Sequence, residues 1–288
     1  MRWQDSERSK NVDDRRGKTM KRVGGGIGIG AILMAVLALF MGGDPQSIIQ
    51  DVVSQSQASQ TQNSPVNLED RPDYALGEFV KVVLKETEDV WNVLFPEQLG
   101  RNYKEPVLVL YDQQTSSGCG YASSATGPFY CPGDQKLYID LSFYNELKTR
   151  FGASGDFAMA YIVAHEVGHH VQHLLDITTQ VEMQKRRMSK AQANQMSVRL
   201  ELQADFLAGV WAHHGPKMKG FLEKGDLEEA VEAAAAVGDD RIQMRSRGYV
   251  VPDAFTHGTS EQRVRWFKKG LMSGKLSDGD TFAQGVAL

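Results

Sequence analysis

Residues 161–172 read YIVAHEVGHHVQ, and the fold can be argued outward from this stretch. In a helix, residues four positions apart lie one turn above each other on the same face. His165 and His169 have this spacing, so a helix through them directs two imidazoles at one point. Glu166 completes the pattern HExxH, which pairs zinc-binding imidazoles with a carboxylate base. The surrounding residues are apolar, and two histidines and a glutamate in an apolar setting need polar partners or a metal.

A zinc site requires a third protein ligand, and the next two histidines of the same helix are poor candidates. His170 points about 100° away from its neighbour around the helix axis. His173 lies two turns beyond His165, about 12 Å along the axis at 1.5 Å per residue. The longer pattern HExxHxxGxxH is excluded, because Gln172 and Leu175 occupy its glycine and third-histidine positions. The third ligand is therefore expected on another element.

The next long helical segment offers a second pair of side chains at helical spacing. Residues 200–209 read LELQADFLAG, in which Glu201 and Asp205 are four positions apart among apolar residues. Two carboxylates on a buried face need a positive partner. Zinc supplies it if Glu201 is the third ligand and Asp205 accepts a hydrogen bond from a ligand imidazole. The alternative is a solvated helix face with Arg199 or Gln203 nearby.

The chain from residue 71 to residue 288 has the patterns of one globular domain. Apolar residues at helical spacing predict a helix over 78–95, and VLVLY predicts a buried strand over 107–111. The other predicted elements, in chain order, are a hairpin of strands 129–131 and 136–141 and helices over 142–150, 156–174, 189–214, 226–237 and from 260 onward. Strands precede most of the helices, so the predicted class is α+β, with a small mixed sheet.

The segment before this domain has three parts of different composition. Residues 1–22 are mostly charged, residues 23–43 carry no charge, and residues 44–70 are rich in Gln, Ser and Asn. The uncharged run has about the 20 residues with which a helix crosses a bilayer. Basic residues precede it and acidic residues follow it, which predicts a cytoplasmic tail, a transmembrane helix, a flexible linker and an extracytoplasmic domain. A cleaved signal peptide is the alternative, which the long charged leader disfavours.

Cysteine content and net charge limit the remaining possibilities. Cys119 and Cys131 are the only cysteines, and they flank a stretch rich in Gly and Ser. Outside the cytoplasm they are expected to form a disulfide, and two reduced thiols are the alternative. The net charge of −4 and the pI of about 6.0 provide no basic surplus, so no nucleic-acid partner is expected.

Several segments together resemble one protein family. HEVGHH at 165–170, ELQAD at 201–205 and THGTSEQR at 256–263 are similar to segments of a bacterial membrane-anchored family called "putative neutral zinc metallopeptidase". The resemblance covers nearly the whole chain, including the opening MRWQDSERSKNVDDRR. It implies a zincin-like metallopeptidase domain of the gluzincin type, in which a glutamate of ExxxD on a later helix completes HExxH.

The resemblance implies roles for individual residues. The implied ligands of one Zn²⁺ are His165, His169 and Glu201. Asp205 would support a ligand histidine, and Gly127–Cys131 would bind a peptide backbone as an added strand. The protein would be a single-pass protein of the bacterial cytoplasmic membrane, with its N-terminus inside and its catalytic domain on the periplasmic side.

Peptide hydrolysis at such a site needs a base and a hydrogen-bond donor to the oxyanion. Glu166 is the expected base. His257 is the candidate donor, with Arg263 as its possible support. Tyr249 and Tyr161 are alternative donors that the sequence does not separate from His257.

Three functions remain open at this point. We expect a membrane-anchored zinc endopeptidase that acts on a protein or peptide substrate. The alternative from another class is a membrane-tethered binding or assembly protein with structural zinc and without proteolytic activity. Glu166 argues against it, since structural zinc sites normally have four protein ligands and no use for a free carboxylate. A zinc hydrolase of a non-peptide bond, such as a cell-wall amide, is a third possibility.

Overall fold

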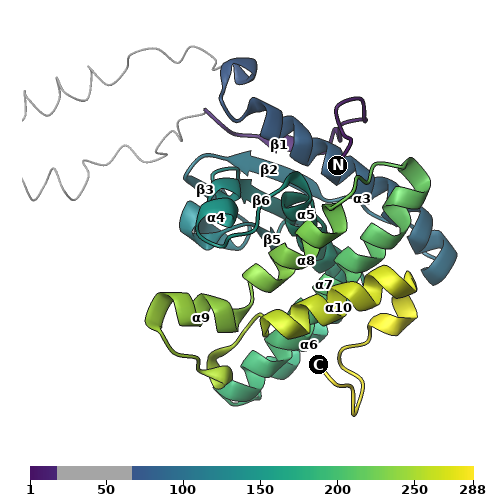
Figure 1. Cartoon of the computed structure of the whole chain (residues 1–288). Helices are drawn as coiled ribbons and strands as arrows, with labels where there is room; N and C mark the ends of the chain where they lie inside the picture. The colour runs from purple at the N-terminus through teal and green to yellow at the C-terminus, as the bar shows by residue number, and fades with distance from the viewer. Residues whose placement is uncertain (18–66) are drawn as a thin grey trace, which may run out of the picture. The chain divides into compact units, whose positions relative to one another are not determined.

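The computed structural model describes residues 1–17 and 67–288 (Figure 1). Met1–Arg16 and Glu69–Leu288 form one compact unit. The predicted transmembrane helix over 23–43 and the predicted linker up to residue 66 lie outside the described residues. Of the helices in the described ranges, none is both long and apolar enough to span a bilayer.

A four-stranded mixed sheet forms one layer of this unit. Its strands, in spatial order, are β1 (Val12–Asp14), β2 (Val107–Tyr111), β6 (Lys136–Asp140) and β5 (Phe129–Cys131). The first three are parallel, and β5 runs antiparallel to β6. The two central strands, VLVLY and KLYID, are almost continuously buried, as expected for strands covered on both faces. This order leaves β5 as an edge strand next to the helical layer.

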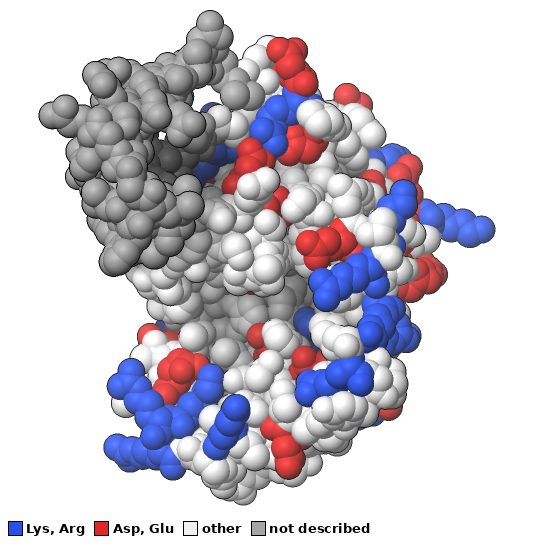
Figure 2. Space-filling model, turned by 90° about the vertical axis from the view of Figure 1, so that its left-hand side faces the viewer, with Lys and Arg blue, Asp and Glu red and all other residues white. Residues whose placement is uncertain are grey.

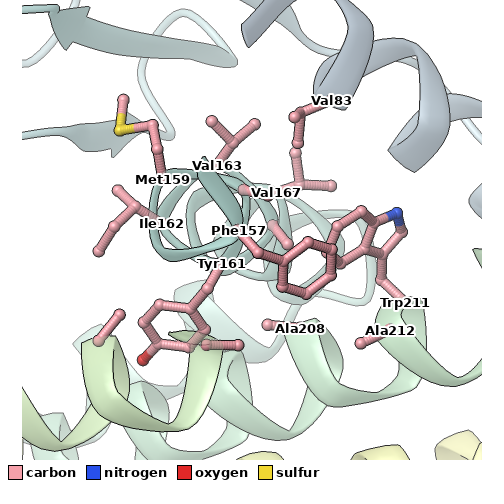
Figure 3. Packing of buried hydrophobic residues seen from close by; sticks show 14 of the residues in the cluster. Val83, Phe157, Met159, Tyr161, Ile162, Val163, Val167, Ala208, Trp211 and Ala212 are labelled. Carbon is pink, nitrogen blue, oxygen red and sulfur yellow. The ribbon is translucent and has the colours of Figure 1, made fainter. Parts of the chain in front are cut away.

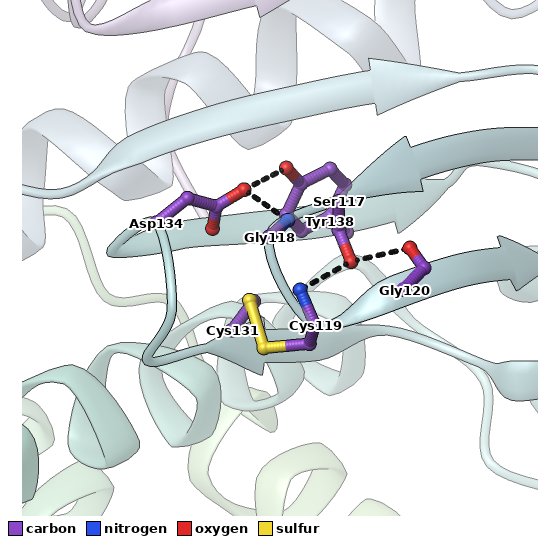
Figure 4. The surroundings of a disulfide bond; sticks show 7 residues. All are labelled: Ser117, Gly118, Cys119, Gly120, Cys131, Asp134 and Tyr138. Carbon is purple, nitrogen blue, oxygen red and sulfur yellow. Dashed lines mark hydrogen bonds between the residues drawn. A yellow bond between two sulfur atoms is a disulfide. The ribbon is translucent and has the colours of Figure 1, made fainter.

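The predicted disulfide is confirmed and joins a second sheet to this edge. The hairpin of β3 (Gln114–Ser117) and β4 (Gly120–Ser123) carries Cys119 in its turn, and Cys131 ends β5, with 5.8 Å between their Cα atoms (Figure 4). Beside the disulfide, Asp134 accepts hydrogen bonds from the Gly118 amide at 2.7 Å and the Tyr138 hydroxyl at 2.5 Å. These contacts hold the hairpin against the edge strand.

Helices make up the second layer, so the predicted mixed α+β class is confirmed. They are α3 (Tyr74–Leu94), α4 (Phe143–Thr149), α5 (Asp156–Leu174), α6 (Ile177–Lys185), α7 (Lys190–Lys219), α8 (Asp226–Ala236), α9 (Asp239–Arg247) and α10 (Ser260–Ser273). Short helical turns are η1 (Leu68–Asp70), η2 (Phe95–Leu99), η3 (Ser124–Thr126), η4 (Pro252–Ala254) and η5 (Leu276–Gly279). The sequence did not predict α6, α9, β1 or the β3–β4 hairpin.

The helix that carries HEVGH, α5, lies at the centre of the core. Figure 3 shows Val83 of α3 on one side of it and Ala208 and Trp211 of α7 on another. The Phe157 ring stacks on Trp211 with centroids 5.6 Å apart. Nearly every residue from Phe157 to Val167 is buried, which explains why this helix is apolar around most of its circumference.

A glycine lets α5 and α7 approach each other closely at the level of the site. A Cβ atom at Gly168 would lie 2.9 Å from the Ala204 carbonyl oxygen and 3.1 Å from the Ala204 Cα. Any side chain at this position would therefore push the two backbones apart. The glycine inside HEVGH thus allows ELQAD to face the two histidines.

The N-terminal residues correct the predicted domain organisation. The expectation that residues 1–22 form a separate tail is wrong for Met1–Arg16, which belongs to the same unit as Glu69–Leu288. Strand β1 pairs in register with β2, with Val12 opposite Leu108. We call Met1–Arg16 the N-terminal arm.

The many charges of the arm are typical of a solvated segment, which is why the sequence predicted a tail here. In the fold several of these charges pair with each other or with the domain. The Arg16 side chain is fully buried and donates to Asp14 through Nε at 2.9 Å and Nη2 at 2.7 Å. Composition alone therefore does not distinguish a solvated charged segment from a docked one.

Candidate metal centre

The structure brings together the three residues that were predicted to bind a metal. Nε2 of His165 lies 3.2 Å from one carboxylate oxygen of Glu201, and Nε2 of His169 lies 3.4 Å from the other. The ligand atoms of this trio all lie within 4.8 Å of one another. Both imidazoles, one turn apart on α5, therefore converge on a carboxylate of α7.

Each histidine is held at its other nitrogen by an acceptor. Nδ1 of His165 lies 2.8 Å from Asp205 Oδ1, and Nδ1 of His169 lies 2.9 Å from Gln172 Oε1. These oxygens accept the Nδ1 proton, which leaves the Nε2 lone pair for a metal. Asp205 takes the position expected of it. The role of Gln172 was missed, although its spacing of three residues from His169 within one helix was a usable signal.

Asp205 is itself held by two further side chains. Arg263 donates to it through Nε at 2.9 Å and Nη2 at 3.0 Å, and the Tyr161 hydroxyl also donates to it. Arg263 was predicted to support the metal site and His257, and the structure pairs it with the fully buried Asp205. Tyr161 is fully buried and hydrogen-bonded to the same carboxylate, so it is no longer a candidate oxyanion donor. A buried carboxylate attracts such donors because it needs compensation.

The charges of the site favour a cation between the three candidate ligands. Burial alone would raise the pKa of Glu201, but the facing His169 and His165 outweigh it and hold this pKa well below its usual range. Burial would lower the pKa of His165, yet Asp205 and Glu201 raise it to about 9. A site that favours a proton on the His165 imidazole can exchange it for a divalent ion.

The donor set fits zinc. Two imidazole nitrogens and one carboxylate oxygen are ligands of catalytic zinc sites, which keep a further position for water or substrate. The close approach at Gly168 and the acceptors behind both imidazoles hold these donors in place without an ion. His165, His169 and Glu201 are therefore the residues that would hold Zn²⁺.

A cleft of about 450 Å³ opens over this trio. Phe129 and Tyr130 of the edge strand line it, together with the preceding residues 127–128, and Glu166 and His257 line it as well. Its apolar lining residues are Phe143, Phe151, Ile162, Leu200, Val237 and Ile242. A larger cavity of about 1160 Å³ lies between α6, α7 and the C-terminal residues, but Glu166, His257 and the candidate ligands do not line it. The smaller cleft is therefore the candidate active site.

His257 is the one predicted oxyanion donor that lines the cleft. Tyr249 is 59% exposed and does not line it. The Nδ1 atom of His257 lies 3.1 Å from Asp239 Oδ1, and Asp239 Oδ2 accepts the His257 amide at 2.7 Å. Burial would lower the pKa of His257, but the hydrogen bond to Asp239 and the charge of Glu201 raise it above its usual value. The ring is therefore poised as a cationic donor at the cleft.

Asp239 is a residue that sequence reasoning missed. It begins α9 and lies 18 positions before His257. The same Oδ2 also accepts the amide protons of Thr256 at 2.7 Å and Gly258 at 3.2 Å. No local pattern links it to THGTSEQR, because only the tertiary structure brings the start of α9 against this loop.

The two remaining histidines of the opening stretch lie away from the trio, as expected. The His170 ring bridges the Lys104 carbonyl oxygen at 2.6 Å and the Tyr130 hydroxyl at 3.0 Å. Its burial lowers the pKa to about 4. His173 lies 3.3 Å from the Gln135 amide nitrogen. His170 thus ties α5 to the edge strand and leaves the metal position to its neighbour.

The surface charges agree with the absence of a basic surplus in the sequence. On the face shown in Figure 2, Lys and Arg are interspersed with Asp and Glu, and uncharged atoms cover the centre.

Fold and site together define a candidate mononuclear zinc centre of the HExxH-plus-glutamate type on an α+β domain. The chain belongs to the family described as "Putative neutral zinc metallopeptidase", whose profile matches residues 1–282. This membership covers the N-terminal arm as well as the metal centre.

Relatives of the chain carry no stated activity. "Uncharacterized protein YpfJ" of Escherichia coli K12 is 44% identical over 292 residues, which cover 99% of this chain and 100% of that protein. "Uncharacterized protein Mb2605" of Mycobacterium bovis is 43% identical over 204 residues, which cover 67% of this chain and 66% of that protein. No solved structure matches the chain.

Proposed function

We propose that this protein is a zinc-dependent endopeptidase. The observation that carries the proposal is the convergence of two imidazoles of α5 on Glu201 of α7, in a cleft that also holds Glu166 and His257. Three candidate protein ligands suit a catalytic site, whereas a structural zinc site normally has four. The family name supports the same class.

The edge strand β5 supports a peptide as substrate. It is the last strand of the sheet, and its residues line the cleft beside the trio. An extended peptide can add to such an edge through main-chain hydrogen bonds, which recognise any sequence of suitable shape. The apolar residues that line the cleft would then receive a side chain of that peptide.

Polar side chains in and around the cleft can be assigned roles in peptide hydrolysis. Bound zinc would supply Lewis acidity, which polarises a carbonyl group and lowers the pKa of a bound water. Glu166 would accept the proton of the attacking water and pass it to the leaving nitrogen. His257, held by Asp239, would donate a hydrogen bond to the oxygen on which negative charge develops. Asp205 and Gln172 would keep both ligand imidazoles oriented.

We place the protein at a bacterial cytoplasmic membrane, with the metal centre on the extracytoplasmic side. The uncharged run over 23–43 supports attachment to the bilayer. The disulfide Cys119–Cys131 supports an oxidising compartment. Substrates would then be membrane, secreted or envelope proteins.

The decisive test is Glu166→Gln in the full-length protein. The change should leave zinc content unchanged and lower kcat/KM on a cleaved protein substrate by about 10²- to 10⁴-fold, the usual contribution of a general acid–base. Glu182→Gln, the same change at an exposed position of α6, is the matched control and should keep full activity.

Two outcomes would contradict the proposal in different ways. Full activity of Glu166→Gln would show that this carboxylate is not the base. No zinc-dependent cleavage by the wild-type protein, measured by mass spectrometry of extracytoplasmic proteins, would leave the binding or assembly protein as the better explanation.

A further inference from the structure

The backbone of the N-terminal arm is part of the sheet. The Leu108 amide donates to the Asn11 carbonyl at 2.9 Å, and the Arg15 amide donates to the Leu110 carbonyl at 2.8 Å. Figure 1 shows β1 beside β2 and below α3. Undocking the arm would strip β2 of one hydrogen-bonded neighbour and expose its main-chain groups.

Polar groups buried by the arm depend on it for their partners. Glu88 of α3 is 3% exposed, and its Oε1 accepts the Ser9 hydroxyl at 2.6 Å and the Asn11 amide at 2.9 Å. The buried guanidinium of Arg16 pairs with Asp14 and also approaches Asp73 at 3.4 Å. These contacts join the arm to the same unit that holds the metal centre.

Helix α3 carries a position that is shaped for the arm. A Cβ atom at Gly77 would lie 2.6 Å and 2.7 Å from the two terminal nitrogens of Arg16. Glycine within a helix is unfavourable compared with alanine. Its presence here makes room for the arginine.

Chain connectivity then limits how the protein can meet a membrane. The segment between Arg16 and Glu69 leaves one unit and returns to it. A single crossing of the bilayer would put those two residues on opposite sides. Two crossings would need about 40 apolar residues, since each takes about 20. Residues 23–43 form an uncharged and largely apolar run, whereas residues 44–66 contain two aspartates and many Gln and Ser residues.

We propose that the N-terminal arm and the metal centre lie on the same side of the membrane, so that the chain between Arg16 and Glu69 does not connect them by a single crossing of the bilayer. This replaces the predicted single pass with the N-terminus inside. The disulfide places both parts in the oxidising compartment. The inference does not depend on peptidase activity.

Labelling of single cysteines in the full-length, membrane-bound protein tests whether the N-terminal arm and the domain lie on the same side of the membrane. Lys10→Cys reports on the exposed surface of the arm, and Lys224→Cys reports on the exposed surface of the domain. Spheroplasts are treated with a membrane-impermeant maleimide before and after permeabilisation, and the unaltered protein is the control for its own two cysteines. Equal labelling of both positions in each condition supports the proposal. Labelling of one position with protection of the other overturns it.

A second measurement asks whether the arm is docked in the same preparation. Helix propensity predicts that Gly77→Ala raises the melting temperature of the detergent-solubilised, full-length protein. A docked Arg16 predicts instead that Gly77→Ala lowers the melting temperature, because the new methyl group would displace the Arg16 guanidinium. In the Arg16→Ala background, Gly77→Ala should lower the melting temperature less, or should raise it. An equal rise in melting temperature in both backgrounds would show an undocked arm and overturn the proposal.

Discussion

Two buried arginines hold two different regions of this protein by the same contact. Arg16 in the arm and Arg263 in α10 each donate hydrogen bonds to one aspartate through two guanidinium nitrogens. The nitrogen–oxygen distances are 2.7–2.9 Å for Asp14 and 2.9–3.0 Å for Asp205. Both arginine side chains are at most 4% exposed. The two pairs differ in what else the aspartate contacts. Asp205 also holds His165, whereas Asp14 belongs to strand β1.

The role of each ion pair therefore depends on the other contacts of its aspartate, which are a candidate metal ligand for Asp205 and strand β1 for Asp14. Replacement of Arg263 leaves the charge of fully buried Asp205 uncompensated, whereas replacement of Arg16 removes one partner of Asp14, whose side chain is 13% exposed. Only at Asp205 does the same change also release a candidate metal ligand. Variants of the two arginines should therefore separate effects on stability from effects on zinc.

The largest combined effect is expected for Arg263→Ala. Loss of the partner of fully buried Asp205 should lower the free energy of unfolding by about 3–5 kcal/mol. The freed carboxylate would hold His165 less well, so zinc affinity should fall by about 10- to 100-fold. Denaturant unfolding and competition with a chelating dye measure the two effects. Unchanged zinc affinity would remove Arg263 and Asp205 from the support of the metal centre.

A smaller effect, on stability alone, is expected for Arg16→Ala. Asp14 keeps 13% of its side chain exposed, so water compensates part of its charge, and we expect a loss of about 2–3 kcal/mol. Zinc affinity should not change. Arg265→Ala is the matched control, because its partner Glu261 is 82% exposed and such surface pairs contribute about 0–1 kcal/mol. Equal losses for the two variants would mean that the arm is not docked.

The smallest effect concerns the pH dependence contributed by His257 and Asp239. The pKa of His257 is raised and that of Asp239 is lowered in the fold. Their pair therefore stabilises the protein fully between the ordinary pKa values of the two groups, 3.8 and 6.5. This stability is lost as the pH rises through the raised pKa of His257 or falls through the lowered pKa of Asp239.

Asp239→Asn should remove this contribution from unfolding curves measured in chelator between pH 5 and 9. The His257 side chain is 49% exposed, so solvent screening limits the change to about 1 kcal/mol or less. In the His257→Gln background, Asp239→Asn should no longer change the pH dependence of unfolding over this range. A pH dependence equal to that of wild type would show that the two groups are not coupled.

Local patterns predicted the elements and residues whose partners lie within a few positions. The helix predicted over 156–174 matches α5, and the capping contact of Ser189 with Gln192 starts α7. The pairing of HExxH with ELQAD was also within reach, because each motif places its polar residues on one helix face. The structure brings these residues together, and their roles in metal binding and catalysis stay predictions.

Residues that act across the fold were not predictable in this way. Asp239 contacts His257 from the start of a helix that the sequence did not indicate, and Arg263 contacts Asp205 rather than His257. The many charges of the N-terminal arm suggested a solvated segment, whereas the structure packs the arm against the domain. In each case the partner is far away in the chain, and no periodicity encodes such pairings.

By itself, the sequence determined the spacing of the candidate ligands, the position of the candidate base and the α+β class, because helical periodicity and burial are local properties. Only the tertiary structure decided that α5 and α7 meet at Gly168, that Asp239 positions His257, and that the N-terminal arm completes the sheet. The physical reason is that these contacts depend on close packing and on the pairing of buried charges. Both are set by the whole fold rather than by neighbours in the chain.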